Sequence, residues 1–198
     1  MDQTDLQILD SVTAGDTDAY ELIVRRYQGM VYDLAYRLLG DASEAEDAAQ
    51  AAFIRMYSSL GSYKREMAFR NWAYTITLNV ARNKLKRRNL LSFLPFLAGK
   101  DAEDAGGGVP EPAEAGGEPD AQLEGGRLRS DLEGAIGALP EDLRTPFVLF
   151  HLHRLPAGDI AETLGVTPNA VSLRLFKARG RLARALSPVY PEYNTEDI

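Results

Sequence analysis

The stretch that most constrains the fold is residues 155–186, LPAGDIAETLGVTPNAVSLRLFKARGRLARAL, which has the pattern of two helices joined by a tight turn. The first helix has apolar residues at i, i+1 and i+4, and Gly165 then closes it, since a helix often ends on a left-handed residue that glycine adopts at little cost. Thr167 can cap the second helix through its hydroxyl, and Pro168 suits the first helical position. The pattern predicts a helix-turn-helix whose second helix enters a major groove.

The second helix of this motif is strongly basic. Residues 168–186 contain one Lys and four Arg and no acidic residue, which fits a neighbour that carries phosphates. The alternative is a basic, solvated helical hairpin without a nucleic-acid role, although a surface evolved only for solubility usually mixes both signs of charge. We expect a buried stripe of Val171, Leu175, Ala178, Leu182 and Ala185, opposite a polar face of Asn169, Ser172, Arg174, Lys177, Arg181 and Arg184.

Composition excludes several classes of protein. The 198 residues include no cysteine, which excludes disulfides, thiol redox sensing and cysteine-ligated zinc. No run of about 18 apolar residues exists, so we expect no membrane insertion. The acidic start lacks the basic and apolar parts of a signal peptide, so we expect a cytoplasmic protein. His151 and His153 point in different directions on a helix, so we expect no metal site, and we expect no cofactor.

The net charge of −7 is unevenly distributed. Residues 1–90 are balanced, residues 91–126 have a net charge of −7, residues 127–186 of +3 and residues 187–198 of −3. The acidic excess therefore belongs to a spacer rich in Ala, Gly, Pro and Glu, which cannot bury a core and is a flexible linker, and to an irregular tail. The chain is acidic overall but still has basic regions able to meet nucleic acid.

Four helices are expected in residues 1–90, packed as one domain. Ser43 followed by Glu46 fits a capping box at the start of the third helix. That helix has a core face of Ala49, Ala52, Phe53, Met56 and Leu60. Apolar spacing of three and four predicts helices over about residues 5–14, 17–39, 43–60 and 69–88.

The fourth of these helices combines aromatic and basic residues. Residues 67–90 contain six basic residues and no acid, and aromatic residues lie near their start. Unstacked bases need a flat surface to stack on and positive charge for the backbone. Phe69 and Ile76 fit the core better, Trp72 fits both roles, and Tyr63 and Tyr74 are the better candidates for stacking on bases.

The predicted fold class is all-α, with two small helical domains joined by a flexible acidic linker. The first domain is residues 1–90, and the second, residues 127–186, contains the helix-turn-helix. Residues 91–126 begin with an apolar segment that is too short to span a bilayer and continue as the linker. The apolar segment either packs on the first domain or meets a partner. Residues 187–198 form the tail.

Together these stretches resemble the bacterial RNA polymerase sigma factors of the extracytoplasmic-function (ECF) group. DAYELIVRRYQGMVYDLAYRLLGD, AEDAAQAAFIRMYSSLGSY and FRNWAYTITLNVARNKLKRR resemble the family's region 2, and ALPEDLRTPFVLFHLHRLPAGDIAETLGVTPNAVSLRLFKARGRL resembles its region 4. The resemblance implies that region 2 binds core polymerase and recognises and melts the −10 promoter element. It implies that region 4 recognises the −35 element.

The resemblance also implies roles for residues at matching positions. For the −10 element, where a flipped base is captured, they are Tyr63, Lys64, Arg65, Asn71, Trp72, Tyr74, Asn79 and Arg82. For the −35 element they are Asn169, Ser172, Arg174 and Lys177. The clamp of the polymerase's largest subunit would meet Asp47, Gln50 and Phe53, and the flap tip would meet Leu139, Phe147 and Phe150.

Three positions depart from the family pattern. Ala51 stands where an acid is usual after the docking Gln50, which removes one expected clamp contact. Arg65-Glu66-Met67 replaces the Gly-Glu or Gly-Asp of the base-capture loop, and Ser172-Leu173 replaces Lys-Ser. The last two changes fall on base-reading positions, so the promoter sequence is not predicted.

The expected function is that of a specificity subunit and not of an enzyme, because the sequence has no nucleophile–base pair, metal cluster or phosphate loop. The resemblance implies core RNA polymerase and promoter DNA, duplex and single-stranded, as partners. It also implies an anti-sigma factor, which residues 91–97 would serve unless they serve self-inhibition. The acidic linker is similar to a nucleic acid in charge, so we expect it to thread the positively charged polymerase channel. A conventional helix-turn-helix regulator, acting without being a polymerase subunit, is the alternative. It explains residues 155–186 but not the aromatic, basic fourth helix.

Overall fold

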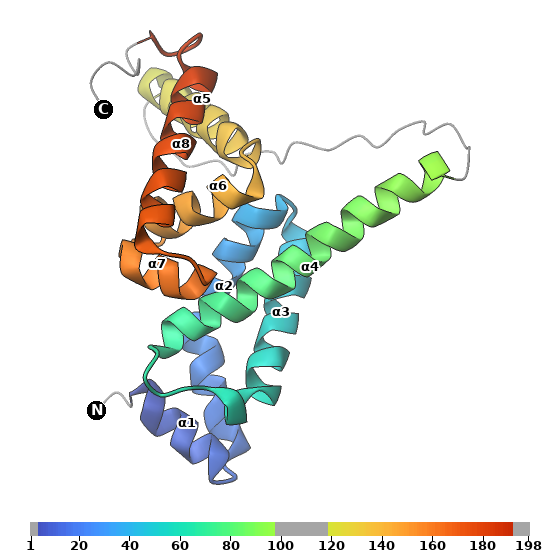
Figure 1. Ribbon diagram of the computed structural model, residues 1–198, viewed down its shortest axis with the longest axis vertical. Helices are drawn as coiled ribbons and strands as arrows, with labels where there is room; N and C mark the ends of the chain where they lie inside the picture. The colour runs from blue at the N-terminus through green and yellow to red at the C-terminus, as the bar shows by residue number, and fades with distance from the viewer. Residues whose placement is uncertain (1–3, 98–118, 192–198) are drawn as a thin grey trace. The chain divides into compact units, whose positions relative to one another are not determined.

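The computed structural model describes residues 4–97 and 119–191, and the side-chain surroundings of residues 4–90 and 126–191. Every regular element in these ranges is a helix, so the all-α prediction is confirmed for them. The chain divides into two compact units (Figure 1). The first is Met1–Asp104 with Gly158–Gly165, and the second is Ala105–Ala157 with Val166–Ile198. The domain bounds expected from the sequence, 1–90 and 127–186, stay predictions.

The first unit is built on three long helices, α2 (Tyr20–Leu39), α3 (Ala42–Ser58) and α4 (Phe69–Leu97). Each packs against the other two, and α1 (Asp5–Thr13) packs against α2. The 3-10 turns η1 (Thr17–Ala19) and η2 (Leu60–Ser62) precede α2 and follow α3. Figure 1 shows α4 crossing α2 and α3.

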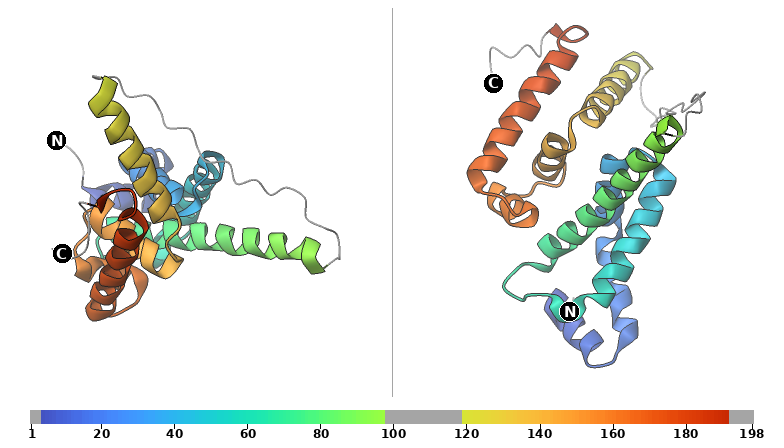
Figure 2. Two further views of the ribbon diagram at one scale, coloured as in Figure 1. Left: turned by 90° about the horizontal axis from the view of Figure 1, so that it is seen from above. Right: turned by 45° about the vertical axis from the view of Figure 1, so that its right-hand side comes forward.

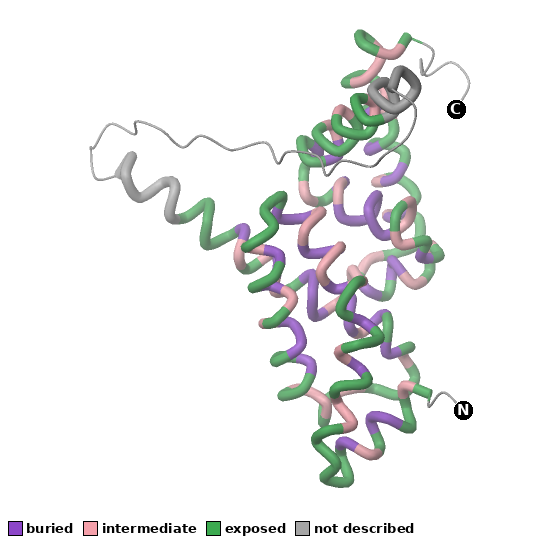
Figure 3. The backbone as a smooth tube through the Cα atoms, turned by 180° about the vertical axis from the view of Figure 1, so that it is seen from behind, coloured by how far each residue is buried: buried purple, intermediate pink, exposed green. Residues whose placement is uncertain are grey.

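Apolar stripes spaced by three and four residues form the core of the first unit, as the sequence predicts. Figure 3 shows these buried positions recurring along the helices. Two tyrosines complete the packing with their hydroxyls: Tyr20 donates to the carbonyl of Phe53 at 2.8 Å, and Tyr27 donates to Asp5 Oδ2 at 2.5 Å. The cluster comprises Ile8, Leu9, Val12, Ile23, Tyr27, Val31, Ala52, Phe53, Met56, Phe69, Ala73 and Ile76.

Several helix ends differ from the prediction. The cap of α3 is Asp41, whose carboxylate accepts the amide of Glu44 at 2.7 Å, so the capping box of Ser43 and Glu46 is wrong. Gly40, with φ +73°, ends α2 directly before Asp41 and fixes where α3 starts. Helix α4 continues to Leu97 instead of ending near Arg88. No glycine or proline lies in residues 88–94, so the sequence has no stop signal at Arg88. The side chains of residues 91–97 and the linker residues 98–118 lie outside the described residues.

In the second unit, α5 (Pro119–Gly137) and α6 (Glu141–Phe147) pack against α8 (Pro168–Leu186). Figure 2 shows α5 and α8 running side by side. Helix α5 begins at Pro119, before the expected start near Arg127. The buried apolar residues of this unit are Ile136, Leu139, Leu143, Phe147, Val148, Leu149, Leu155, Val171, Leu175, Ala178 and Leu182.

A π turn follows α6 directly. The segment η3 (Val148–Leu152) follows Pro146, which is buried inside α6 and has no amide hydrogen to donate. The wider turn closes with the amide of His153 donating to the carbonyl of Val148 at 3.1 Å.

The connection before α8 has the predicted local geometry. Helix α7 (Ala157–Leu164) is followed by Gly165 with φ +65°. Thr167 Oγ1 accepts the amide of Ala170 at 3.2 Å, and Pro168 stands at the first helical position. The predicted buried stripe of α8 is confirmed from Val171 to Leu182, but Ala185 is exposed because it lies in the last turn, beyond the packed part of the helix.

Candidate nucleic-acid and polymerase interfaces

An aromatic cluster supports the loop between η2 and α4. The ring of Tyr63 lies 5.6 Å from that of Phe69, edge to face, and 5.2 Å from that of Trp72. The Tyr63 hydroxyl donates to the carbonyl of Met67 at 2.7 Å, and burial raises the pKa of Tyr63, so the hydroxyl stays protonated and able to donate. Tyr63 therefore holds the loop in shape, and its side chain is half-buried.

The two cations of this loop differ in their surroundings. Lys64 and Arg65 are both exposed. Arg65 forms an ion pair with Asp10 of α1, which ties the loop to the start of the chain. An exposed ion pair of this kind contributes at most about 1 kcal/mol, so a phosphate can replace the carboxylate at little cost. The loop is thus fixed by its aromatic residues more than by its charges.

Not all the predicted −10 residues of α4 are accessible. Asn79 is exposed and Trp72 and Arg82 are half-buried, whereas Asn71 and Tyr74 are buried. The Arg70 guanidinium lies 5.6 Å from the centre of the Tyr74 ring and donates to its hydroxyl at 3.3 Å. Tyr74 is therefore a core residue in this structure, and its ring has no face open to a base.

The basic end of α4 is partly neutralised by α3. Lys84 Nζ lies 3.1 Å from Asp47 Oδ2, and Arg88 lies 3.1 Å from Glu44 Oε2. Arg88 also donates to the carbonyl of Leu39 at 3.2 Å. These contacts fix α4 to the α2–α3 corner and place Asp47, an expected polymerase contact, beside a lysine.

The polymerase-docking face predicted on α3 is only partly exposed. Asp47 and Gln50 are exposed, but Phe53 is 9% exposed and belongs to the core. Its neighbour Ile54 is 64% exposed, and Tyr57, one turn further on, is also exposed. Residue 54 lies two helical turns from Asp47, on the same face. The exposure of Ile54 can be predicted from the sequence. Ala45, Ala48, Ala52 and Met56 form the buried stripe of α3, and position 54 lies on the opposite side of the helix.

The recognition face of α8 contains two apolar side chains that the sequence analysis missed. Asn169, Ser172 and Lys177 are exposed as predicted, and Arg174 is half-buried. The Ser172 hydroxyl donates to the carbonyl of Pro168 at 3.2 Å. Leu173 is 53% exposed and Phe176 is 68% exposed. Both positions lie off the buried stripe of α8, so the helical period alone predicts that they are exposed. Apolar side chains on this face suit contact with the methyl groups of thymine.

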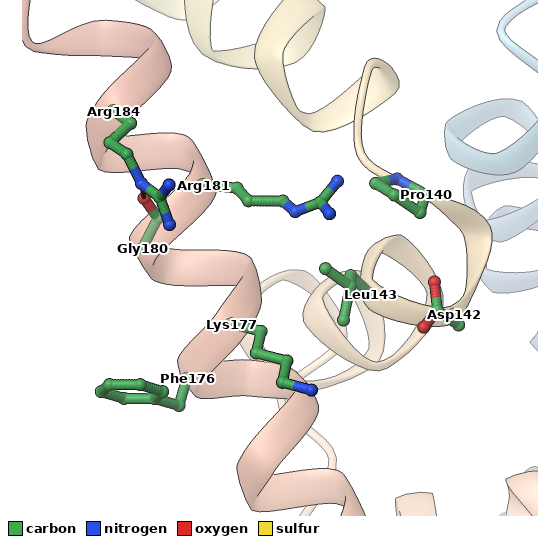
Figure 4. Close-up of a pocket in the computed structure, with 8 residues that line it drawn as sticks. All are labelled: Pro140, Asp142, Leu143, Phe176, Lys177, Gly180, Arg181 and Arg184. Atoms are coloured by element: carbon green, nitrogen blue, oxygen red, sulfur yellow. Dashed lines mark hydrogen bonds between the residues drawn. The ribbon is translucent and has the colours of Figure 1, made fainter.

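An open groove lies between α6 and α8, with a volume of about 630 Å³. Figure 4 shows Lys177 and Arg181 reaching from α8 toward α6. Three cations and one carboxylate line the groove, so its charge is positive. Its lining is Pro140, Asp142, Leu143, Phe176, Lys177, Gly180, Arg181 and Arg184.

The residues expected to hold the polymerase flap are largely internal. Leu139 and Phe147 are buried, and Phe150 is half-buried. Phe147 and Phe150 contact the ring of His151, with centroids 4.5 Å and 5.0 Å away. The Nε2 atom of His151 is buried and has no hydrogen-bond partner within the part of the chain that the structure describes.

The second unit is expected to lose stability in mild acid. Burial, together with the charges of Arg179 and Arg154, lowers the pKa of His151 from its ordinary 6.5. The unfolded state therefore binds a proton first, so the stability is complete above about pH 6.5 and declines as the pH falls toward the lower pKa of the folded state. Hydrogen exchange of α8 amides at about pH 7.5 and 5.5, corrected for intrinsic rates, measures this loss. His151→Phe keeps a flat ring but cannot bind a proton, so it should remove most of this pH-dependent loss of stability. An equal loss of stability in His151→Phe would show that His151 is not its cause.

Among residues 4–90 and 126–191, no group of three or more His, Asp or Glu side chains is placed to hold a metal ion. In the ranges where helices are described, none is long and apolar enough to cross a membrane.

Comparison with known proteins identifies the family. The sigma-70 region 2 family matches residues 23–90, and the sigma-70 region 4 family matches residues 129–182. The RNA polymerase sigma-H factor of Pseudomonas aeruginosa is 33% identical to this chain over 191 residues, which is 96% of this chain and 97% of that protein. The ECF RNA polymerase sigma factor SigW of Bacillus subtilis is 31% identical, over 90% of this chain and 94% of its own length.

The fold agrees with this family. The sigma factor RpoE of Bartonella quintana, solved in complex with the anti-sigma factor NepR, superposes with a TM-score of 0.64 at 20% identity, over 85% of this chain and 96% of that chain. CnrH, solved with the cytosolic domain of CnrY, gives a TM-score of 0.62 at 21% identity, over 92% of this chain and 96% of that chain. The chain therefore belongs to the sigma-70 family, as an RNA polymerase sigma factor of the ECF group.

Proposed function

We propose that this chain binds core RNA polymerase, directs it to specific promoters and helps to melt their −10 element. The observation that most favours this function is that two different nucleic-acid surfaces occur in one chain. One surface has aromatic rings beside exposed cations, at the loop before α4. The other is the basic helix α8, which has no acidic residue. The first suits unstacked bases and the second suits a duplex.

We assign the −10 surface to the loop and to the accessible part of α4. Lys64 and Arg65 meet the backbone, with Arg65 exchanging Asp10 for a phosphate. The half-buried Trp72 and the exposed Asn79 offer a ring edge and an amide to bases. Flipping a base costs a few kcal/mol of stacking energy, which stacking of that base on an aromatic ring offsets. Tyr74 supports this surface from the core, and the buried Asn71 donates to Glu162 at 3.3 Å.

We assign polymerase docking to the exposed face of α3, with Ile54 as its apolar centre between Asp47, Gln50 and Tyr57. An exposed aliphatic side chain surrounded by polar groups is typical of the energetically dominant part of an interface. The action is that of a specificity subunit in the cytoplasm, where polymerase works, and involves no catalysis by this chain. An anti-sigma factor is a further proposed partner, since the similar RpoE structure is a complex with one.

Size-exclusion chromatography of the full chain with core RNA polymerase tests the docking part of this function. A stoichiometric complex that survives about 150 mM salt is expected, because an interface with an apolar centre is less sensitive to salt than a purely charged one. A conventional helix-turn-helix regulator would elute separately from core while still binding duplex DNA. That result would favour the alternative.

A further inference from the structure

The groove between α6 and α8 brings three cations of one helix together. It has a volume of about 630 Å³, and Lys177, Arg181 and Arg184 line it from α8. These residues stand at i, i+4 and i+7, so they form one row along the helix. Figure 4 shows Arg181 reaching from α8 toward Pro140. The only carboxylate among the lining residues is that of Asp142, so the charge of the groove is positive.

The described part of the protein does not neutralise this row of cations. Lys177 and Arg181 form no ion pair or hydrogen bond with residues 4–90 and 126–191. Arg184 donates only to a backbone carbonyl, that of Gly180, at 3.1 Å. Like charges that gather without a counter-charge favour the binding of an anionic group. The groove is therefore suited to an acidic occupant.

The groove also has an apolar part, which restricts what can fill it. Pro140 and Leu143 line it from α6, and Phe176 lines it from α8 with an exposed fraction of 68%. Phosphate groups alone would leave these apolar side chains without a contact. A peptide segment that has both carboxylates and an aromatic side chain would contact the cations and the apolar part together.

The residues that follow the described end of the chain have this chemistry. The structure describes the chain as far as Pro191, and residues 192–198 are EYNTEDI, with three carboxylate side chains, one tyrosine and no Lys or Arg. The linker is also acidic, but its residues 98–118 contain no aromatic residue. Residues 192–198 therefore match the groove in both charge and apolar content.

The described end of the chain lies within reach of the groove. The amide of Tyr190 donates to the carbonyl of Leu186 at 2.8 Å, which holds Tyr190 at the end of α8. At about 1.5 Å per residue, Leu186 lies about 7.5 Å along the helix axis from Arg181 and about 13.5 Å from Lys177. Seven extended residues span about 23 Å, so residues 192–198 are long enough to cover the whole row of cations.

We propose that residues 192–198 bind in the groove between α6 and α8 and there compete with promoter DNA. The proposal rests on the proposed function of α8 as the duplex-binding helix and adds a regulation of that helix. Lys177 belongs both to the groove and to the polar face of α8, so a segment bound in the groove covers a residue expected to contact DNA.

The expected size of the effect follows from the short connection between the segment and the groove. Segments joined in this way meet at an effective concentration of about 1 mM. If the separate segment binds with a Kd of about 0.1 mM, it occupies the groove about nine-tenths of the time in the intact chain. Binding of a duplex is then weakened by about 10-fold.

Duplex binding with and without the segment tests the competition. The probe is a fluorescein-labelled random-sequence duplex of about 24 base pairs at low salt, since phosphate contacts do not depend on sequence. Deleting residues 192–198 should strengthen binding by about 10-fold. The deletion also removes three negative charges, which repel DNA in general, so it is repeated in Arg181→Gln. There it should strengthen binding by less than about 3-fold, because the segment has already lost a central partner in the groove.

Arg129→Gln is the matched control for the groove variant. Arg129 is an exposed arginine of α5 in the same unit and is not among the residues that line the groove. Its substitution makes the same change of charge as Arg181→Gln. The deletion should strengthen duplex binding in Arg129→Gln by about 10-fold, as it does in the wild-type chain.

A separate peptide measures docking without DNA. A fluorescein-labelled peptide of residues 191–198 is titrated with the chain that lacks residues 192–198. A Kd of about 0.1 mM is expected, and Arg181→Gln or added salt should weaken the binding by about 5-fold or more. A peptide with Glu192→Gln, Glu196→Gln and Asp197→Asn should lose the binding. A peptide of residues 101–118 tests the linker as the occupant.

The outcomes decide which segment occupies the groove. A gain in duplex binding on deletion that is smaller in Arg181→Gln, together with binding of the 191–198 peptide, supports the proposal. An equal gain in both backgrounds overturns it, because the segment then acts through its charge alone. Tighter binding of the 101–118 peptide also overturns it and assigns the groove to the linker. If no form of the chain binds the duplex, the proposed function of α8 fails, whereas the peptide titration still decides whether the segment docks.

Discussion

Replacing Ile54 with aspartate is expected to weaken binding to core RNA polymerase by about 100-fold or more, with the free energy of unfolding within about 0.5 kcal/mol of wild type. Ile54 is 64% exposed, so its side chain contributes little to the fold. A charge at the centre of a docked apolar contact would be desolvated without a partner, which is costly. Competition with a labelled wild-type chain for core polymerase measures the affinity, and chemical denaturation measures the stability.

Two variants make this prediction specific to one face of α3. Phe53→Ala should cost about 3–5 kcal/mol of unfolding free energy, because Phe53 is 9% exposed and its removal leaves a cavity in the core. Val189→Asp is the matched control, because Val189 is an apolar side chain of the second unit with a similar exposure of 54%. It should leave the affinity for core unchanged. If Ile54→Asp binds core as tightly as wild type, the proposed docking face is wrong.

Reversing the charge of Lys177 is expected to weaken promoter binding by polymerase holoenzyme by about 30- to 100-fold at low salt. Lys177 is exposed on α8 and borders the positive groove beside α6. Lys177→Glu removes one attraction to the DNA and adds a repulsion from the neighbouring phosphates. The difference from wild type should shrink as salt is raised, because screening weakens both effects. Fluorescence anisotropy with a duplex promoter fragment over a salt series measures the change.

A charge reversal on another helix provides the comparison. Arg129→Glu makes the same change of charge on α5, at an exposed position. It should lower the affinity by less than about 3-fold, through the general field of the protein alone. Lys177→Arg should stay close to wild type. Equal losses in Lys177→Glu and Arg129→Glu would mean that net charge, and not a specific contact of α8, sets the affinity.

The sequence predicts the helical fold well where caps and periodicity agree. The turn before α8 is the clearest case, because Gly165, Thr167 and Pro168 each have a separate physical reason for their place. The start of α3 is less clear from the sequence, because Asp41 and Ser43 are both suitable N-cap residues. Asp41 is the cap in the structure, since it directly follows the left-handed Gly40 that ends α2.

The candidate site is harder to predict than the fold, because adjacent apolar residues are ambiguous. Phe53 and Ile54 are both apolar and adjacent in sequence, but they lie about 100° apart around the helix. Phe53 is therefore in the core, whereas Ile54 is exposed. Tyr74 likewise fits a base-stacking role by its residue type, whereas packing buries it beside Arg70. The left-handed backbone of Arg154, with φ +58°, is not visible in the sequence, because no glycine or asparagine stands at that position.

Multi-round transcription with purified core RNA polymerase on a pool of genomic promoter fragments, with and without this protein, tests the central claim most directly. We predict new, discrete start sites that depend on the protein, preceded by two shared sequence elements at about −10 and −35. The two surfaces act together in that reaction, one on melted strands and one on the duplex. Specific binding of the protein to duplex DNA without core, together with no protein-dependent transcripts, would contradict the account and identify a conventional regulator.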